Sequence, residues 1–400
     1  MALIPLFLVS GLLHAYVGWR IGPALAVLGG TWGGAWGGVE WAFWLLLALS
    51  AALVPMGLVA KRFAKQQPMT DVLTWLGLLC MGLMSSLFVL TLLRDGLLLV
   101  ADALVWLLPG ALPDLLTPAS LSVGSAVAVP LLGLGVTALG YWNARRTAGV
   151  VRVDVPIAGL PADLHGFTVA QISDIHVGPT IKHGYLQNIV SAVNALGVDL
   201  VAITGDLVDG SVKELARHVA PLSNLTSRHG TYFVTGNHEY YSGAHAWINE
   251  LRRLGVRVLM NEHVVLNHGD PKEEASTAML VVAGVSDYSA HHFDETHRSD
   301  AQAAIDGAPE HAGVRLLLAH QPRSAPAAAQ AGFDLQLSGH THGGQFWPWN
   351  HFVRFQQPFT AGLHKLQDLW VYTSRGTGYW GPPKRFGAPS EITHLRLVAA

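Results

Sequence analysis

Cysteine is almost absent from this chain of 400 residues, which contains Cys80 alone. No disulfide can form within the chain, and a zinc site built from several thiolates is excluded. Charge is also scarce, since only 13% of the residues are Asp, Glu, Lys or Arg. The 25 basic and 27 acidic side chains nearly balance, and no basic stripe appears. The sequence therefore predicts no nucleic-acid partner.

The charges and the histidines are unevenly distributed. Residues 1–142 contain only ten charged side chains, whereas 19 of the 20 histidines lie beyond residue 142. A change of composition this large marks a domain boundary in a chain too long for one ordinary domain. We therefore predict two domains, residues 1–146 and residues 147–400.

The first domain consists mainly of long apolar runs. A helix needs about 20 mainly apolar residues to cross a bilayer. Four stretches come close: Ala2 to Trp19, Trp41 to Ala60, Val72 to Leu93 and Leu121 to Trp142. Two more are ambiguous, since Ile21 to Val39 is rich in glycine and Leu97 to Leu112 is short and contains Asp102. We expect an α-helical transmembrane bundle of about four to five spans that begins with an uncleaved anchor.

The positions of Lys and Arg predict how these spans are oriented. With four spans, two basic clusters fall on one side of the membrane, and Arg20 and Arg94 fall on the other. The clusters are Lys61, Arg62 and Lys65, and Arg145, Arg146 and Arg152. Positive clusters favour the cytoplasmic side, so the second domain is expected in the cytoplasm. The spans contain no series of charges typical of a transport path, which favours an anchor over a transporter.

The second domain shows short β-rich runs that alternate with helical stretches, the pattern of a layered α/β domain. Glu262 to Thr277 and Tyr288 to Pro309 are polar and are expected to be loops or a small cap. Helices are expected at 185–196, 244–254 and 325–331. Strands are expected at 151–155, 167–172, 200–204, 231–234, 257–260, 279–285, 314–318, 335–337, 369–373 and 392–397.

Five of these strands run into metal-binding types of side chain. The loop Ser338 to Gly344 holds two histidines among glycines, and in extended backbone residues i and i+2 point to the same side. An open α/β sheet binds its ligand outside the carboxyl ends of its strands. The donors there are oxygen and nitrogen without sulfur, which suits two divalent ions such as Mn, Fe or Zn if one carboxylate bridges them. The seven donors are Asp174, His176, Asp206, Asn237, His320, His340 and His342.

The order and spacing of these motifs resemble the calcineurin-like metallophosphoesterase superfamily over about residues 165–400. The motifs are Asp174-x-His176, Gly205-Asp206, Gly236-Asn237-His238-Glu239, His320 and Gly339-His340-Thr341-His342. Gly343-Gly344-Gln345 and Ser374-Arg375-Gly376 resemble a bacterial membrane-anchored branch, which implies the bacterial inner membrane. The fold implied by the resemblance is a four-layer sandwich of two mixed β-sheets flanked by helices.

The resemblance also implies roles for the site residues. Asp174, His176, Asp206 and His342 would hold one metal, and Asp206, Asn237, His320 and His340 the other, with His238 as an acid rather than a ligand. Two such ions lower the pKa of bound water toward ~7, so hydroxide would attack phosphorus in line. His238 would protonate the leaving oxygen, which contributes about 100- to 10,000-fold.

Other side chains near these motifs have competing interpretations. Asp209 is expected to be a cap or a partner of a ligand, and Asp287 a possible substrate-side residue. Arg375 is a candidate phosphate donor that could equally pair with a carboxylate. His291, His292 and His297 lie among acidic residues and indicate a solvated loop. Trp347 and Trp349 fit a substrate rim, a bilayer contact or simple packing.

The sequence thus predicts a membrane-anchored, dinuclear-metal phosphohydrolase. A lipid-linked phosphoester or pyrophosphate is a sensible substrate for an enzyme attached to the membrane. Two alternatives remain open at this stage. One is a phosphodiesterase that acts on a soluble substrate, and the other is a membrane sensor that binds a phosphorylated ligand without hydrolysing it.

Overall fold

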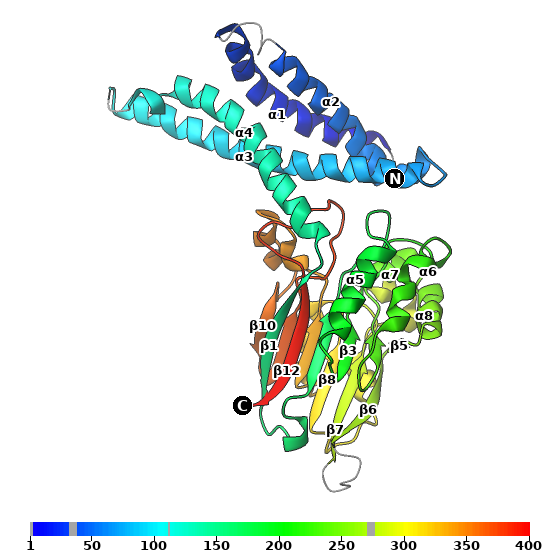
Figure 1. Cartoon of the computed structure of the whole chain (residues 1–400). Helices are drawn as coiled ribbons and strands as arrows, with labels where there is room; N and C mark the ends of the chain where they lie inside the picture. The colour runs from blue at the N-terminus through cyan, green and yellow to red at the C-terminus, as the bar shows by residue number, and fades with distance from the viewer. Residues whose placement is uncertain (1–2, 32–37, 111–112, 270–276) are drawn as a thin grey trace. The chain divides into compact units, whose positions relative to one another are not determined.

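The computed structural model describes residues 3–31, 38–110, 113–269 and 277–400 (Figure 1). The chain divides into two compact units. The first comprises Met1–Trp142 with Gly381–Lys384, and the second comprises Asn143–Trp380 with Arg385–Ala400. The boundary predicted between residues 146 and 147 stays a prediction, and no sequence pattern indicated that residues 381–384 belong with the first unit.

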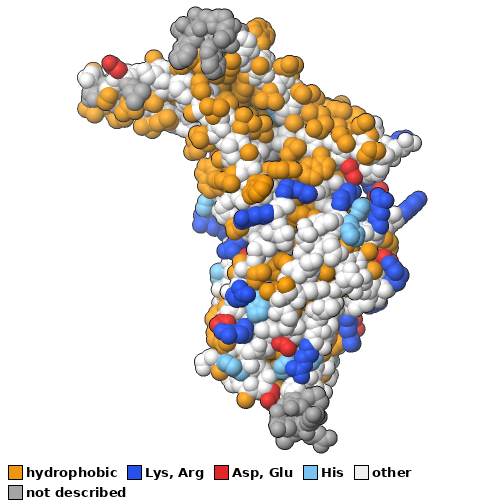
Figure 2. All heavy atoms as spheres, in the orientation of Figure 1, with side chains coloured by type: hydrophobic (Ala, Val, Ile, Leu, Met, Phe, Trp, Pro, Cys, Tyr) orange, Lys and Arg blue, Asp and Glu red, His pale blue; other side chains and the backbone are white. Residues whose placement is uncertain are grey.

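The first unit is built from helices, four of them long and apolar enough to cross a membrane. Figure 2 shows hydrophobic side chains over most of its visible surface, whereas the second unit has a mixed surface. The ambiguous stretches extend neighbouring helices: the described part of the first continues α1 to Thr31, and the second continues α3 to Leu107. The helices are α1 (Leu3–Thr31), α2 (Val39–Leu58), α3 (Met69–Leu107) and α4 (Pro118–Arg145).

Polar contacts inside this unit correct one expectation. Arg20 lies within α1 and Arg94 within α3, not beyond the ends of their helices. The Arg20 guanidinium lies 2.8 Å from the Asp95 carboxylate, which also accepts a hydrogen bond from the Tyr16 hydroxyl at 2.5 Å. Opposite charges that meet inside the bundle offset each other, so the helices continue past them.

The second unit contains two six-stranded mixed sheets. The first has the order β1 (Gly149–Ile157), β12 (Glu391–Ala399), β2 (Thr168–Ile172), β3 (Leu200–Ile203), β4 (Thr231–Phe233), β5 (Arg257–Val258). The second has the order β10 (Gly362–Leu366), β11 (Leu369–Thr373), β9 (Leu335–Ser338), β8 (Val314–Leu318), β7 (Thr277–Gly284), β6 (Glu262–Gly269). The strands β2, β3 and β4 run parallel, as do β8 and β9.

Alternate residues of each strand face opposite layers, because side chains in a strand point up and down in turn. Val169 and Leu316 belong to one core shared by the two sheets, whereas Ile172 packs with helices on the outer face of the first sheet. Leu317 packs with helices on the outer face of the second sheet. This arrangement confirms the predicted four-layer sandwich. The flanking helices are α5 (His183–Asn194), α6 (Val212–Val219), α7 (Asn237–Ser242), α8 (Ala244–Arg253), α9 (Ala301–Ile305) and α10 (Ala325–Gln330).

Two polar stretches expected to be loops contain regular structure. Strand β6 lies within Glu262 to Thr277 and pairs antiparallel with β7. Val264 and Leu266 face the core between the sheets, whereas Val265 and Asn267 are exposed. The next seven residues, 270–276, lie outside the described part of the chain. The stretch Tyr288 to Pro309 includes α9, which Asp300 caps by accepting hydrogen bonds from the backbone of Gln302 and Ala303. Strand β10 was not predicted either.

Candidate metal centre

The candidate site lies where five parallel strands from the two sheets end. The loops that follow β2, β3, β4, β8 and β9 carry all seven predicted ligands. Six of them form two clusters of three residues, and within each cluster the donor atoms lie within 4.8 Å of one another. One cluster is Asp174, His176 and His342, and the other is Asp206, His320 and His340.

In the first cluster, ring nitrogens of two histidines lie close together. The Nε2 atoms of His176 and His342 are 3.1 Å apart, and His342 Nε2 is 3.5 Å from Asp174 Oδ1. Asp206 Oδ2 lies 3.9 Å from His176 Nε2, so this carboxylate adjoins both clusters. Two imidazole nitrogens that face each other at this distance repel unless they share a proton or a cation. The donor set therefore fits a divalent ion.

A buried oxygen without a hydrogen-bond partner lies beside the second cluster. His320 Nδ1 donates to the Thr204 carbonyl at 2.7 Å, which leaves Nε2 as the ligand atom, 3.2 Å from both Asp206 Oδ2 and His340 Nδ1. Asn237 is the first residue of α7, which follows β4, and its buried Oδ1 has no hydrogen-bond partner among the described residues. Buried oxygens without a partner are costly and rare. A cation bound by this cluster would supply the missing partner.

The backbone of these loops differs from the expected extended conformation. Five of the seven predicted ligands have positive φ angles, between 51° and 70°: Asp174, His176, Asp206, His340 and His342. Such angles are uncommon for residues other than glycine, and strained backbone of this kind concentrates at functional sites. The left-handed turns send the two histidines of the 338–344 loop to different clusters, whereas an extended loop would aim both at one place.

The glycines around the ligands are required by close approaches. A Cβ atom on Gly339 would lie 2.0 Å from Ser173 Oγ and 2.2 Å from Asp174 Oδ2. A Cβ atom on Gly236 would lie 2.2 Å from Asp206 Oδ1. Any larger residue at these two positions would displace a predicted ligand.

Burial and neighbouring charges set the protonation of the cluster. Burial alone would raise the pKa of Asp206, but His320 holds it well below its ordinary value. Burial would lower the pKa of His320, whereas the Asp206 carboxylate raises it well above. Burial and the charge of His320 lower the pKa of His340 to about 3, and burial also lowers the pKa of His342. His340 and His342 are therefore neutral imidazoles, the form that binds a metal.

The predicted acid, His238, lies beside the clusters on α7. Its Nδ1 donates to Asp209 Oδ1 at 2.6 Å, and the same oxygen accepts from His176 Nδ1 at 3.0 Å. Burial would lower the pKa of His238, but this hydrogen bond and the carboxylates of Asp206 and Asp209 raise it to about 9. The imidazole is thus protonated at neutral pH, and Asp209 is a partner of a predicted ligand, as expected.

Two buried side chains brace these loops and had no role in the sequence analysis. Glu239 accepts hydrogen bonds from the backbone N–H groups of Asp206, Leu207 and Gly236. It occupies the third position of α7, where a glutamate caps a helix by reaching back, and this pattern could have identified it. Arg385 is fully buried and donates to the carbonyls of His342 and Arg375, a long-range contact with no signal in the sequence.

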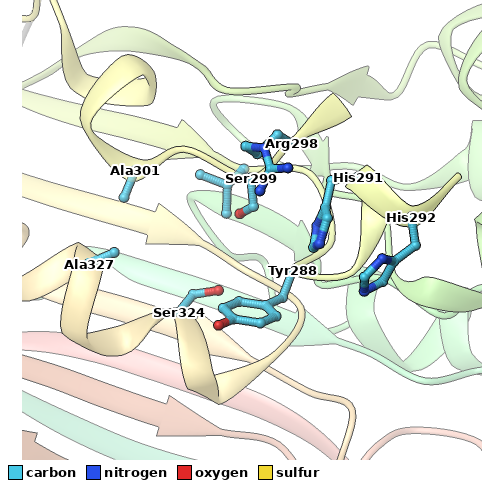
Figure 3. A pocket seen from close by; sticks show the side chains of 9 residues that line it. Tyr288, His291, His292, Arg298, Ser299, Ala301, Ser324 and Ala327 are labelled. Atoms are coloured by element: carbon cyan, nitrogen blue, oxygen red, sulfur yellow. The ribbon is translucent and has the colours of Figure 1, made fainter. Parts of the chain in front are cut away.

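The remaining candidates lie outside the two clusters. Arg375 pairs with Glu391 at 2.9 Å, the alternative left open by the sequence, and its side chain also lies against Gly343. Asp287 is fully buried and accepts hydrogen bonds from Ser289 and Gln321. His291 and His292 line a separate cavity of about 430 Å³ together with Tyr288 and Arg298 (Figure 3).

Comparisons with known proteins identify the family of this chain. Residues 167–344 match the family model "Calcineurin-like phosphoesterase". A protein of Bos taurus named "Transmembrane protein with metallophosphoesterase domain" is 37% identical over 80% of this chain and 73% of its own length. A protein of the same name from Danio rerio is 38% identical over 68% of this chain and 63% of its own. An uncharacterised metallophosphoesterase of Campylobacter jejuni is 35% identical over 64% of each. Relatives therefore occur in animals as well as bacteria.

Proposed function

The chain belongs to the calcineurin-like phosphoesterase family, and from this premise we propose that it is a membrane-anchored phosphohydrolase with two divalent metal ions. The family and the apolar helices support a membrane-associated phosphoesterase. The observation that carries the dinuclear proposal is the set of seven donors, in which Asp206 adjoins both clusters and Asn237 Oδ1 is buried without a partner. Mn, Fe and Zn all suit such oxygen and nitrogen donors.

The roles of the side chains follow from their contacts. Asp174, His176, Asp206 and His342 would hold one ion, and Asp206, Asn237, His320 and His340 the other. Bound ions of this kind neutralise phosphoryl charge and lower the pKa of water toward ~7. The proposed reaction is direct in-line attack of water on phosphorus, without a nucleophilic side chain. Asp209 holds His238 Nδ1, so the other ring nitrogen can give its proton to the leaving oxygen.

Metal removal tests this proposal. Full-length protein in detergent, stripped with EDTA, should hydrolyse neither p-nitrophenyl phosphate, bis-p-nitrophenyl phosphate nor a lipid-linked pyrophosphate, and added Mn²⁺ should restore turnover of at least one. Relative rates on the three then identify a monoester, diester or pyrophosphate as the preferred bond. Metal bound without turnover of any of them would instead support the non-catalytic sensor.

An exposed aromatic segment beside the site supports a lipid-linked substrate. The histidine loop continues directly into Trp349, Phe352 and Phe355, whose side chains are 41%, 55% and 73% exposed. The Arg354 guanidinium lies over the Phe355 ring, 5.2 Å from its centre. Four large apolar or cationic side chains in a short segment are suited to an acyl chain and its anionic head group.

Hydrogen bonds join the start of this stretch to Trp380, whose ring lies beside the predicted acid. Gln345 donates to the Trp380 carbonyl and accepts from the Trp380 N–H, both at 2.8 Å. The Trp380 ring, 55% exposed, lies 5.8 Å from the His238 ring. An exposed aromatic ring thus lies beside the predicted acid, and the exposed rings of Trp349, Phe352 and Phe355 follow one another a few residues after Gln345. A substrate whose phosphate reaches His238 could place an apolar chain along these rings.

Substitution of both Phe352 and Phe355 by Ser should lower kcat/KM for a lipid-linked pyrophosphate in micelles by about tenfold, because ~1.4 kcal/mol of apolar contact is lost. Hydrolysis of bis-p-nitrophenyl phosphate should be unchanged. Val265→Ser, at an exposed apolar position on β6, serves as the control and should affect neither substrate. Equal rates for the lipid substrate in wild type and the double variant would favour a phosphodiesterase with a soluble substrate.

The basic clusters support a catalytic unit on the cytoplasmic side of the membrane. Lys61, Arg62 and Lys65 lie between α2 and α3, and Arg145 and Arg146 lie at the end of α4. Two spans separate these positions, so both fall on one side, and positive clusters favour the cytoplasm. Protease added to sealed inside-out vesicles should then digest residues 147–400, whereas protection in such vesicles would reverse the orientation.

A further inference from the structure

A further group of His and Asp side chains that could hold a metal lies outside the metal centre. His245 stands in the first turn of α8, Asp294 caps the short helix η7 (Glu295–His297), and His297 is the last residue of that helix. His245 Nε2 is 2.9 Å from Asp294 Oδ2, and the rings of His245 and His297 are 4.7 Å apart, centre to centre. One donor atom of each residue lies within 4.8 Å of the other two.

Neighbouring groups orient two of these three side chains as metal ligands are usually oriented. Asp294 Oδ1 accepts from the backbone N–H and the hydroxyl of Thr296, at 3.0 and 2.6 Å, so Oδ2 is left to face His245. His297 Nδ1 lies 3.0 Å from the Tyr240 hydroxyl, so its other nitrogen is left to face outward. Ligating histidines usually hold a hydrogen bond through the second ring nitrogen in this way.

The protonation of the group is also suited to a cation. Hydrogen bonds from Thr296 lower the pKa of Asp294 to about 2, so the carboxylate is ionised at neutral pH. Burial lowers the pKa of His297, so its imidazole is neutral. A His–Asp pair at the surface contributes little to stability by itself, and such a pair would not require His297 beside it.

We propose that His245, Asp294 and His297 bind a transition-metal ion of the Zn²⁺ class, separate from the metal centre. Two imidazoles and one carboxylate suit Zn²⁺, Co²⁺ or Ni²⁺ rather than Ca²⁺ or Mg²⁺. Tetrahedral zinc holds its donors about 3.3 Å apart. The His245–Asp294 pair, now 2.9 Å apart, would open slightly to admit the ion, and His297 lies within 4.8 Å of both donors. A fourth, open position would be filled by water.

The ion would join two segments that are distant in the sequence. His245 follows α7, which carries Asn237 and His238, whereas Asp294 and His297 belong to the segment that lines the cavity in Figure 3. Tyr240, on α7, already contacts His297. Zinc bound here would therefore hold the 287–300 segment against α8, which directly follows the helix that carries the predicted acid. The ion would stabilise the segment and these two helices.

The test compares full-length wild type with His245→Ala/His297→Ala, in detergent and with Mn²⁺ saturating the metal centre. Wild type should bind one more equivalent of Zn²⁺ than the double variant. With free Zn²⁺ at about 100 times Kd, the wild-type Tm should rise by about 5 °C more than that of the variant. Co²⁺ in place of Zn²⁺ should give the visible absorption of a tetrahedral site in wild type only.

A matched variant tests whether the loss of any two histidines from this part of the chain has the same effect. His291→Ala/His292→Ala removes two histidines from the same segment that line the cavity and lie outside the cluster, so it should retain the extra equivalent and the full rise in Tm. Equal Zn²⁺ stoichiometry and equal Tm response in wild type and His245→Ala/His297→Ala would overturn the proposal. Loss of the extra equivalent in the matched variant would overturn it as well.

Discussion

Asp206→Asn should reduce phosphoester turnover by about 10³-fold and lower the bound metal below two ions per chain. Asp206 belongs to one cluster and its Oδ2 lies 3.9 Å from His176 of the other, and its Oδ1 also accepts the backbone N–H of His238 at 2.9 Å. Asparagine keeps the size of the side chain and one acceptor but removes the charge. The loss therefore reports electrostatic stabilisation, which is often the largest single contribution to catalysis.

Asp199→Ala provides the matched control for this substitution. Asp199 immediately precedes strand β3, at the end opposite Asp206, and accepts hydrogen bonds from Thr168. Its removal should affect stability slightly and leave turnover and metal content at wild-type levels. Retention of activity by Asp206→Asn with two metals bound would contradict the assignment of Asp206 as the bridging ligand.

His238→Gln should reduce turnover by about 10²- to 10⁴-fold while metal content stays unchanged. His238 is held by Asp209 but is not a member of either predicted ligand cluster, and its ring remains partly exposed. Proton donation matters most for poor leaving groups. An alkyl phosphodiester should therefore lose much more rate than bis-p-nitrophenyl phosphate, whose leaving group needs little protonation.

His229→Gln serves as the control, because His229 lies just before β4, at the end opposite His238, and pairs with His268. It should hydrolyse both diesters at wild-type rates. An equal loss for good and poor leaving groups in His238→Gln would show that His238 positions the substrate and is not the acid.

The seven predicted ligands could be chosen from the sequence because each comes after a predicted strand. The runs before Asp174 and Asp206 are rich in apolar, β-branched residues, and the polar residue that follows each run is conspicuous. Parallel strands then bring these residues to one edge. The apolar helices were likewise evident, because no soluble domain keeps so many uncharged runs in series.

Other features depend on contacts between distant residues. Arg385 braces the histidine loop from 43 positions away, and nothing in its neighbourhood indicates that it is buried. The left-handed conformation of His340 and His342 and the close approach of Gly339 to Ser173 are likewise features that the sequence does not reveal. Strand β6 was missed because an edge strand needs few apolar residues.

The most direct test of the dinuclear claim is a Mn²⁺ titration of metal-free, full-length protein in detergent. Bound metal is quantified by mass spectrometry while hydrolysis of bis-p-nitrophenyl phosphate is followed. We predict that turnover appears as the second equivalent of Mn²⁺ binds. Asp206→Asn should neither bind the second equivalent nor gain turnover. Full turnover at one equivalent or less, or turnover that needs no metal, would contradict the account.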